Sequence, residues 1–167
     1  EDGMLGVVLP HGILFRGGAE GKIRKGLLED DLIDAVIGLG PNLFYGAGIP
    51  ACILIIRKNK PAERKGKVLV INGSQELVEG KAQNHLSDAN VKRFANAFAD
   101  FKDEDRFARV VGLDEIRDNE HNLNISRYVS TDEDEVDIDV AVEVVKLNAL
   151  LQQSDEAEAK MMGFLTE

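Results

Sequence analysis

A glycine-rich stretch near the N-terminus is the first candidate for chemistry, as a phosphate-binding loop. It runs from Gly17 to Lys22 and follows an apolar run. A phosphate loop needs GxxxxGK followed by Ser or Thr, because backbone amides wrap the phosphates and the hydroxyl holds magnesium. Here the spacing is one residue too short, Ile23 stands at the hydroxyl position, and Glu20 would repel phosphate. We therefore predict no nucleoside triphosphatase site.

A second glycine pattern, from Gly46 to Ala51, satisfies the GxGxxA fingerprint of dinucleotide-binding proteins. That fingerprint must follow a strand and open a helix. This stretch instead precedes a predicted strand, and Pro50 removes one backbone amide. We therefore predict no dinucleotide site.

Nucleophilic and metal-binding groupings are scarce. His11, His85 and His121 are far apart and outside any HExxH frame, so we interpret each as a surface or loop histidine. No serine lies in a GxSxG setting. The single Cys52 excludes an internal disulfide and a cysteine-based metal site. The sequence predicts no metal site.

Composition is that of a globular domain. The chain has 167 residues, of which 44% are hydrophobic and 30% charged. No apolar run reaches the ~20 residues of a membrane span, and the N-terminal residues are acidic rather than those of a secretory signal. We expect a cytoplasmic protein with no membrane contact. Since a core strand is predicted almost at the first residue, we also expect a piece of a longer protein.

Charge divides the chain into a body and a tail. The net charge is −10, yet residues 132–167 alone hold 11 acidic and 2 basic residues. The near-neutral body leaves room for a local basic patch, although overall acidity argues against non-specific nucleic-acid binding by the whole chain. We predict a body over residues 1–130 and an acidic helical tail over 131–167.

Strand and helix patterns alternate along the body, which predicts an α/β fold. The predicted strands cover residues 5–9, 32–39, 51–57, 67–71 and 108–111, and the predicted helices 19–30 and 88–102. Ser87 is a predicted N-cap, Asp114 is expected to cap another helical turn, and residues 122–129 are expected to be irregular or extended. Residues 51–57 are the most apolar strand, so we place it centrally. The apolar faces of the two helices are predicted from Ile23, Leu27 and Leu28, and from Val91, Phe94, Ala95, Phe98 and Phe101.

The tail is predicted to be helical from about Val136 to Leu165. Its apolar stripe repeats at three- and four-residue steps through Val140, Val144, Leu147 and Leu151. A helix of about 45 Å is longer than one small domain needs. We expect it to pack against a partner, or else to fold back on its own domain.

Several blocks occur in a characteristic order: Val8–Gly18, Gly26–Leu39, Pro41–Gly46, Gly48–Leu54, Gly80–Asn84, Asn122–Ile125 and Arg127–Val129. This series resembles the later blocks of the adenine-N6 DNA methyltransferase (M) subunit of type I restriction-modification systems. The resemblance implies the C-terminal half of a Rossmann-like S-adenosylmethionine-dependent methyltransferase sheet. We expect a mainly parallel sheet completed by a reversed strand and followed by the helical tail.

The resemblance also indicates what the chain lacks. In that family an S-adenosylmethionine loop and a catalytic Asn/Asp-Pro-Pro-Phe/Tyr block precede these blocks. The chain has four prolines and no two are adjacent. We therefore expect no catalytic residue in this chain, and S-adenosylmethionine as a cofactor of the complete subunit alone. The isolated chain is expected to be inactive.

By resemblance, Phe44 and then Tyr45 would provide the aromatic face for a flipped adenine. The alternative is that Phe44 caps the core while Tyr45 faces water. The other residues expected around this target-base pocket are Pro10, His11, Gly12, Gly46 and Gly48.

A cluster of six positive charges within eleven residues is a candidate contact for DNA phosphates. The alternative is a solvated turn between two strands. Its predicted phosphate-binding members are Arg57, Lys58, Lys60, Arg64 and Lys65, with Lys67 next to them.

The resemblance implies three partners: DNA, the specificity subunit and the restriction subunit of the same system. The tail would pack on helices of the specificity subunit. Two alternatives remain at this point: a pure scaffold module of such an assembly, and part of a stand-alone adenine-N6 methyltransferase.

Overall fold

A computed structural model describes residues 3–130 and 140–165 of the chain. The chain divides into two compact units, Glu1–Thr131 and Asp132–Glu167. Each unit is described by itself. The predicted helical residues 136–139 lie outside the described part.

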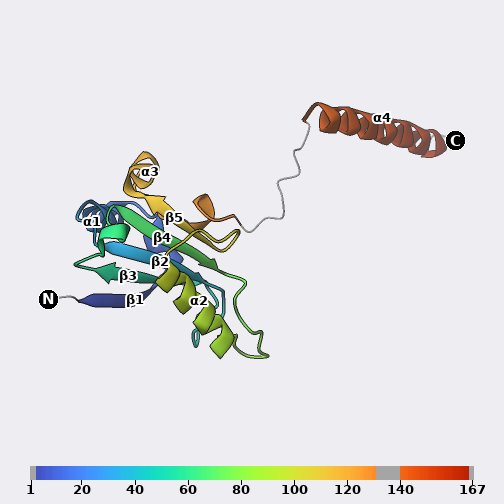
Figure 1. Cartoon of the computed structure of the whole chain (residues 1–167). Coiled ribbons are helices and arrows are strands. Elements are labelled where there is room, and N and C mark those ends of the chain that lie inside the picture. The colour runs from blue at the N-terminus through green and yellow to red at the C-terminus, as the bar shows by residue number, and fades with distance from the viewer. Residues whose placement is uncertain (1–2, 131–139, 166–167) are drawn as a thin grey trace. The chain divides into compact units, whose positions relative to one another are not determined.

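The first unit is built on a five-stranded sheet with the strand order β1-β3-β2-β4-β5 (Figure 1). In chain order, the strands are β1 (Met4–Pro10), β2 (Ile33–Leu39), β3 (Ala51–Arg57), β4 (Lys67–Gly73) and β5 (Ala108–Gly112). All five predicted strands are therefore present, within two residues of their expected ends. As expected, β3 is an interior strand, between β1 and β2.

The expectation of a mainly parallel sheet is wrong for this chain. Among the described strands, only β2 and β4 pair in parallel, while β1–β3, β2–β3 and β4–β5 are antiparallel. For β2 and β3 the reason lies in their connection. Parallel neighbours need a crossover of a dozen or more residues, usually a helix. The loop between β2 and β3 contains no helix, so β3 returns antiparallel beside β2.

Helices cover both faces of the sheet (Figure 1). One face carries α1 (Gly18–Glu29), α3 (Leu113–Asp118) and the segment over residues 119–129, here called the 120s loop. The core on this face includes Leu28, Val36 and Ile116. The other face carries α2 (Asp88–Asp100), with a core that includes Ile37, Ile71 and Phe94. The buried side chains of β2 alternate between these two cores, which explains why the whole strand is buried.

Helix α2 begins where predicted. Ser87 accepts a hydrogen bond from the Asn90 backbone N–H, and the Asn90 side chain accepts from the Ser87 backbone. The predicted buried face is only partly right, because Val91 and Ala95 are exposed while Phe94 and Ala97 are buried. The Phe94 ring packs over Gly73 of β4.

Two other local expectations are corrected. Asp114 does not cap α3: the N-cap is Gly112, and Asp114 lies in the first turn, where it pairs with Arg117. Ile23 of α1 is 65% exposed instead of lying in the core, while Leu28 is buried. Short 3-10 turns occupy His11–Leu14, Ala62–Arg64 and Ile125–Arg127.

The second unit contains α4 (Val140–Leu165). Its large apolar side chains with a described placement are all exposed; they are Val144, Val145, Leu147, Leu150, Leu151, Met161 and Met162. Among the described residues, no helix combines the length and apolar character needed to cross a membrane.

Candidate functional site

The carboxyl ends of β1, β2 and β4 meet at one edge of the sheet. The register brings Pro10 opposite Ala51, and Cys52 opposite Gly38, which in turn lies beside Asn72. Open α/β sheets bind ligands outside the carboxyl ends of their strands. The predicted site residues that follow β1 and β2 therefore emerge at the edge where a ligand is expected.

Phe44 lies in the loop after β2 and borders a pocket of about 380 Å³. The ring is 37% exposed, and the rest of the pocket is lined by Leu39, Leu43 and residues 83–86. Such a volume suits a small ligand group, since ligand pockets span about 300–1,000 Å³. Phe44 thus lies partly exposed at the side of an open hollow, where an aromatic face is available.

Tyr45 has a different environment from its neighbour. It is 97% exposed, so it lines no described cavity. Gly46 has φ +72°, which an L side chain rarely adopts, and a Cβ at Gly48 would meet open space. Tyr45, Gly46 and Gly48 therefore form the exposed part of the loop, while Phe44 is its fixed aromatic.

His11 opens the 3-10 turn that follows β1. Its Nε2 atom lies 3.8 Å from the position of an ideal Cβ at Gly38, on the side where Ile125 packs. Burial lowers the pKa of His11, and a hydrogen bond with the Ala51 backbone opposes that shift. The buried Nε2 has no hydrogen-bond partner among the residues that the structure describes. His11 is thus held mainly in its neutral form.

Pro10, His11 and Gly12 do not line the pocket of Phe44. His11 lies near Ile125, which belongs to the core beneath α1. Leu39 and Leu43, beside Phe44, instead pack with the core beneath α2. The predicted pocket residues therefore share an edge of the sheet but lie towards its opposite faces.

Arg24 fixes the turn after β1. Its guanidinium donates to the backbone carbonyls of Ile13 (2.6 Å), Arg16 (3.0 Å) and His121 (2.8 Å). Only 8% of the residue is exposed, and burial lowers its pKa. Arg24 thus ties α1, the His11–Leu14 turn and the 120s loop together.

Two of the predicted phosphate contacts are instead part of the interior, which corrects the prediction for Lys60 and Arg64. Lys60 donates to Asp31 Oδ1 at 2.6 Å and to the Lys67 carbonyl at 2.7 Å, and its side chain is 1% exposed. Arg64 pairs with the fully buried Asp34 at 3.3 Å. A buried charge requires such partners, so neither side chain is free to meet a phosphate.

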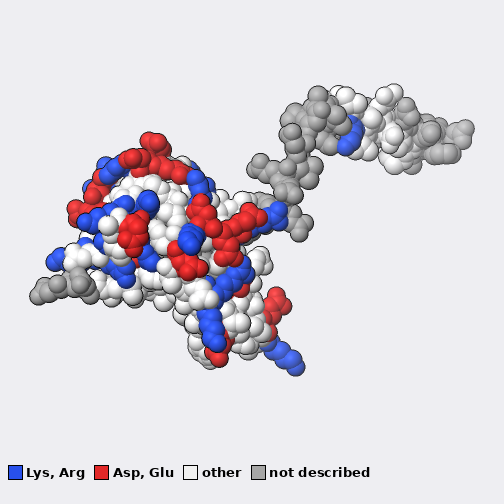
Figure 2. Space-filling model, in the orientation of Figure 1, with Lys and Arg blue, Asp and Glu red and all other residues white. Residues whose placement is uncertain are grey.

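The other members of the basic cluster differ in exposure. Arg57 is partly buried and lies 3.6 Å from Asp34. Lys58 and Lys65 are exposed and border a hollow of about 530 Å³ that also contains Asp30 and Asp31. Figure 2 shows Lys and Arg side chains interspersed with Asp and Glu over the visible face of the body, without a continuous basic stripe.

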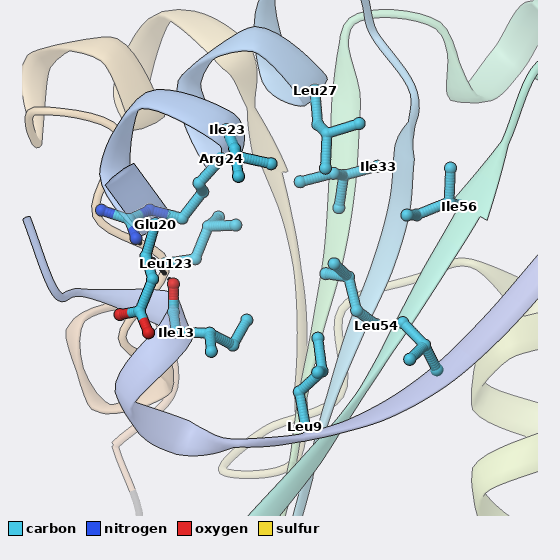
Figure 3. Close-up of a pocket in the computed structure, with 11 residues that line it drawn as sticks. Leu9, Ile13, Glu20, Ile23, Arg24, Leu27, Ile33, Leu54, Ile56 and Leu123 are labelled. Atoms are coloured by element: carbon cyan, nitrogen blue, oxygen red, sulfur yellow. Dashed lines mark hydrogen bonds between the residues drawn. The ribbon is translucent and has the colours of Figure 1, made fainter. Parts of the chain in front are cut away.

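An apolar groove of about 250 Å³ lies between β1, α1 and the α1 face of the sheet. Figure 3 shows Leu9, Ile23, Leu27, Leu54 and Ile56 surrounding it. Two of its lining residues are polar, Glu20 and Arg24, and the Arg24 guanidinium is bonded to backbone carbonyls. The exposed Ile23 belongs to this groove, which explains an apolar position outside the core.

Three features that organise the site were not predicted from the sequence. Asp34 could have been noticed as a lone carboxylate within an apolar strand, and Arg24 as an arginine on the inner face of a helix. Gln83 and Asn84 lie within a block that carries the family resemblance, but nothing in their spacing points to Phe44. Among the described residues, no His, Cys, Asp or Glu group could hold a metal ion.

Comparison with known proteins identifies the family. The family model described as N-6 DNA Methylase matches residues 1–137. The chain is 47% identical to the methylase subunit of the type I restriction enzyme MjaVIII of Methanocaldococcus jannaschii, over 97% of this chain and 28% of that protein. The MpnII methylase subunit of Mycoplasma pneumoniae is 30% identical over the whole chain and 30% of its own length.

Solved structures agree with this assignment. The methyltransferase subunit of a type I restriction-modification system from Streptococcus thermophilus is 45% identical, with a TM-score of 0.73 over 78% of this chain and 27% of that one. The EcoKI M protein, at 20% identity and a TM-score of 0.60, shares the fold over 95% of this chain. The chain thus spans less than a third of the length of the MjaVIII and MpnII subunits. Since the family model covers most of its residues, this chain belongs to the N-6 DNA methylase family, as its blocks predicted.

Proposed function

We propose that this chain provides the target-adenine side of an adenine-N6 DNA methyltransferase, the M subunit of a type I restriction-modification system. The observation that carries this proposal is the partly exposed Phe44 ring at the side of an open hollow, at the edge where β1, β2 and β4 end. DNA methyltransferases extrude their target base, and an extruded base gains about 1–3 kcal/mol by stacking on an aromatic ring. Phe44 is the ring placed to receive it.

The methyl donor, S-adenosylmethionine, would bind to the remainder of the complete protein. This nucleoside carries ribose hydroxyls and an amino acid group, which require polar partners. The groove beside β1 is aliphatic apart from Glu20 and Arg24, and Arg24 is already engaged with backbone carbonyls. The residues of this groove therefore do not fit the donor, and no residue of this chain is assigned to methyl transfer itself.

The same groove and the free edge of β1 suit the rest of a methyltransferase domain. Met4, Leu5 and Val8 of β1 are 48–57% exposed, and an unpaired, apolar edge strand normally needs a covering element. Relatives at 47% and 30% identity are more than three times as long as this chain. In the complete protein, we expect a strand to pair with β1 and a helix to fill the groove.

Lys58 and Lys65 are the remaining candidates for phosphate contacts, because both are exposed at one hollow. Their contacts would add affinity without sequence specificity. Removal of both charges should reduce the salt dependence of DNA binding, with a slope smaller by about 2 in a plot of log K against log salt. An unchanged slope would exclude them as phosphate contacts.

The exposed apolar residues of α4 suit helices of the specificity subunit, and the restriction subunit would join the same assembly. Val144, Leu147 and Leu151 lie on one face, while Val145 and Leu150 widen it to both sides. A surface of this width can meet more than one partner helix.

The test is methylation by the complete subunit, expressed with its companion subunits in a host that lacks adenine methylation. Sequencing that detects N6-methyladenine should reveal one methylated DNA motif. Phe44→Leu keeps an apolar side chain but removes the aromatic face, so we expect the methylation rate to fall about tenfold or more. Phe44→Tyr, which restores an aromatic face, is the matched control and should retain most activity.

Other outcomes identify the alternatives. Unchanged methylation in Phe44→Leu would mean that this region is a scaffold that does not touch the base. Full methylation by the complete protein without any companion subunit would indicate a stand-alone adenine-N6 methyltransferase.

A further inference from the structure

Residues 78–86, here called the brace, form a closed loop beside Phe44. Val78 and His85 exchange backbone hydrogen bonds of 2.8 and 3.0 Å. Inside the loop, the Gly80 amide donates to Asn84 Oδ1 at 3.3 Å. A Cβ at Gly80 would lie 2.1 Å from the Gln83 carbonyl, so the loop closes tightly only around glycine. The brace therefore has a defined shape of its own.

The brace holds the turn that precedes Phe44 through three successive carbonyls. The Asn84 side-chain NH2 donates to the Pro41 carbonyl at 3.0 Å. The Asn84 backbone N–H donates to the Asn42 carbonyl at 2.8 Å. The Gln83 side chain donates to the Leu43 carbonyl at 2.7 Å. Two residues of the brace thus fix each peptide unit of the turn in front of the ring.

The far side of the Phe44 loop has less support. Ala47 donates to the Phe44 carbonyl at 3.0 Å, but Tyr45 and Ile49 are 97% and 61% exposed. Asn42, within the braced turn, has φ +58°, a conformation that needs support from its surroundings. The position of the Phe44 ring is therefore set from the side of the brace.

The brace is itself anchored to the rigid part of the fold. Leu86 packs against the core beneath α2, and Ser87 begins α2 with its capping box. The Phe94 ring of α2 lies over Gly73 at the end of β4. A continuous path of contacts thus runs from the sheet through α2 and the brace to Phe44.

We propose that Gln83 and Asn84 are positioning residues, which fix the Phe44 ring at the distance and angle needed by the extruded adenine. This inference rests on the proposed function of Phe44 as the stacking ring. A displacement of about 1 Å in a positioning group can cost about 100-fold in rate. The two side-chain amides act as hydrogen-bond donors to backbone carbonyls. A carboxylate of the same shape cannot donate, so it should not hold the turn before Phe44.

The experiment uses the complete methylase subunit in its active assembly, with a DNA duplex that contains its methylated motif. Gln83→Glu and Asn84→Asp each replace the donating side-chain NH2 group by a carboxylate oxygen and keep the side-chain size. Gln75→Glu adds the same charge at an exposed site and is the matched control. Single-turnover methylation rate, DNA Kd and thermal stability are measured for each variant.

We expect Gln83→Glu and Asn84→Asp to slow methylation by about 10- to 100-fold, with DNA Kd and thermal stability equal to those of Gln75→Glu. If Gln83→Glu and Asn84→Asp methylate as fast as Gln75→Glu while Phe44→Leu is slow, Gln83 and Asn84 are not positioning residues. The proposed function of Phe44 would be unaffected by that result. A parallel loss of stability and DNA affinity would reduce the brace to general structural support and also overturn the inference. An unimpaired Phe44→Leu would instead refute the proposed function itself.

Discussion

The carboxylate of Asp34 holds two arginines of the basic segment 57–67 against the interior of the fold. It is fully buried in β2 and meets Arg64 at 3.3 Å and Arg57 at 3.6 Å. Arg64 also donates to the Phe98 and Ala99 carbonyls and lies 4.4 Å from the centre of the Phe101 ring. One guanidinium therefore joins β2, the turn before β4 and the end of α2.

Arg64→Met should lower the free energy of unfolding by about 3 kcal/mol. Removal of one partner leaves a buried charge with less compensation, which costs about 3–5 kcal/mol, and Arg57 remains to offset part of it. Urea denaturation of the chain measures this change. Lys65→Met, next to it but exposed, should change stability by less than about 0.5 kcal/mol. Equal effects of the two substitutions would show that the pair with Asp34 adds no stability.

Glu29 is expected to make the stability of the fold depend on pH in the acidic range. Its carboxylate accepts hydrogen bonds from Arg117 at 2.8 and 3.2 Å and lies 2.7 Å from His121 Nε2. These partners lower the pKa of Glu29 from 4.5 to about 2. Because the folded pKa lies below the unfolded one, the stabilisation is complete above pH 4.5 and is lost as pH falls towards 2.

Glu29→Gln should therefore flatten the loss of stability between pH 4.5 and 2. The urea midpoint, measured across this range, is the readout. Glu120→Gln, an exposed carboxylate on the neighbouring turn, should keep the wild-type slope. If Glu29→Gln also follows the wild-type curve, the cluster with Arg117 and His121 does not couple stability to pH.

The exposure of charged residues was the least predictable property at this scale. Lys60 and Arg64 lie in a polar stretch, and their composition is that of a solvated turn. Their partners, Asp31 and Asp34, lie 29 and 30 residues earlier, and only the pairing of the strands brings them together. The same holds for Gln83, which reaches a carbonyl 40 residues away. Phe44, by contrast, was predicted as a site residue because its sequence block carries the family resemblance.

At the scale of elements, the fit between α2 and the sheet depends on one glycine. A Cβ at Gly73 would lie 2.3 Å from Phe94 Cε1 and 2.6 Å from the Gly38 carbonyl oxygen. The ring could turn, but the carbonyl belongs to the backbone of β2. Helix and strand therefore approach each other as closely as glycine allows.

Gly73→Ala should lower the free energy of unfolding by about 1–3 kcal/mol, because overpacking forces the strand or the helix to move. Chemical denaturation measures the change. Gly3→Ala, at an exposed position with open space around it and no positive φ, is the control and should be nearly neutral. A neutral Gly73→Ala would mean that α2 sits less tightly on β4.

The ends of helices and strands could be predicted from local sequence signals, whereas the order of the strands in the sheet could not. The Gly40-Pro41-Asn42 break ends β2, and Ser87 begins α2, because these residues act through their own backbone. The order β1-β3-β2 and the antiparallel pairs depend on which strand meets which, and a short apolar run has no mark of its partner. The error over Val91 and Ala95 has a similar origin, since which face of α2 is buried depends on how the helix meets the sheet.

At the scale of the whole molecule, α4 presents an apolar surface in a unit of its own. Leu147→Glu with Leu151→Glu places two charges on its central face. We expect the amount of specificity subunit that co-purifies with the complete methylase subunit to fall about tenfold or more, because a charge in an apolar interface is costly. Gln152→Glu with Gln153→Glu adds the same charge at exposed polar positions and should retain binding. Equal retention by both pairs would exclude this face as the contact.

The position of β3 between β1 and β2 also has a consequence during synthesis on the ribosome. Among the strands that the structure describes, β1 pairs with β3 alone, yet Ala51 is added to the chain some 40 residues after Pro10. At about 5–20 residues per second, β1 waits several seconds for its partner. During this delay the edge of β1 that later pairs with β3 is open, so Leu5, Val7 and Val8 form a β-prone segment along that edge that a chaperone of nascent chains would bind.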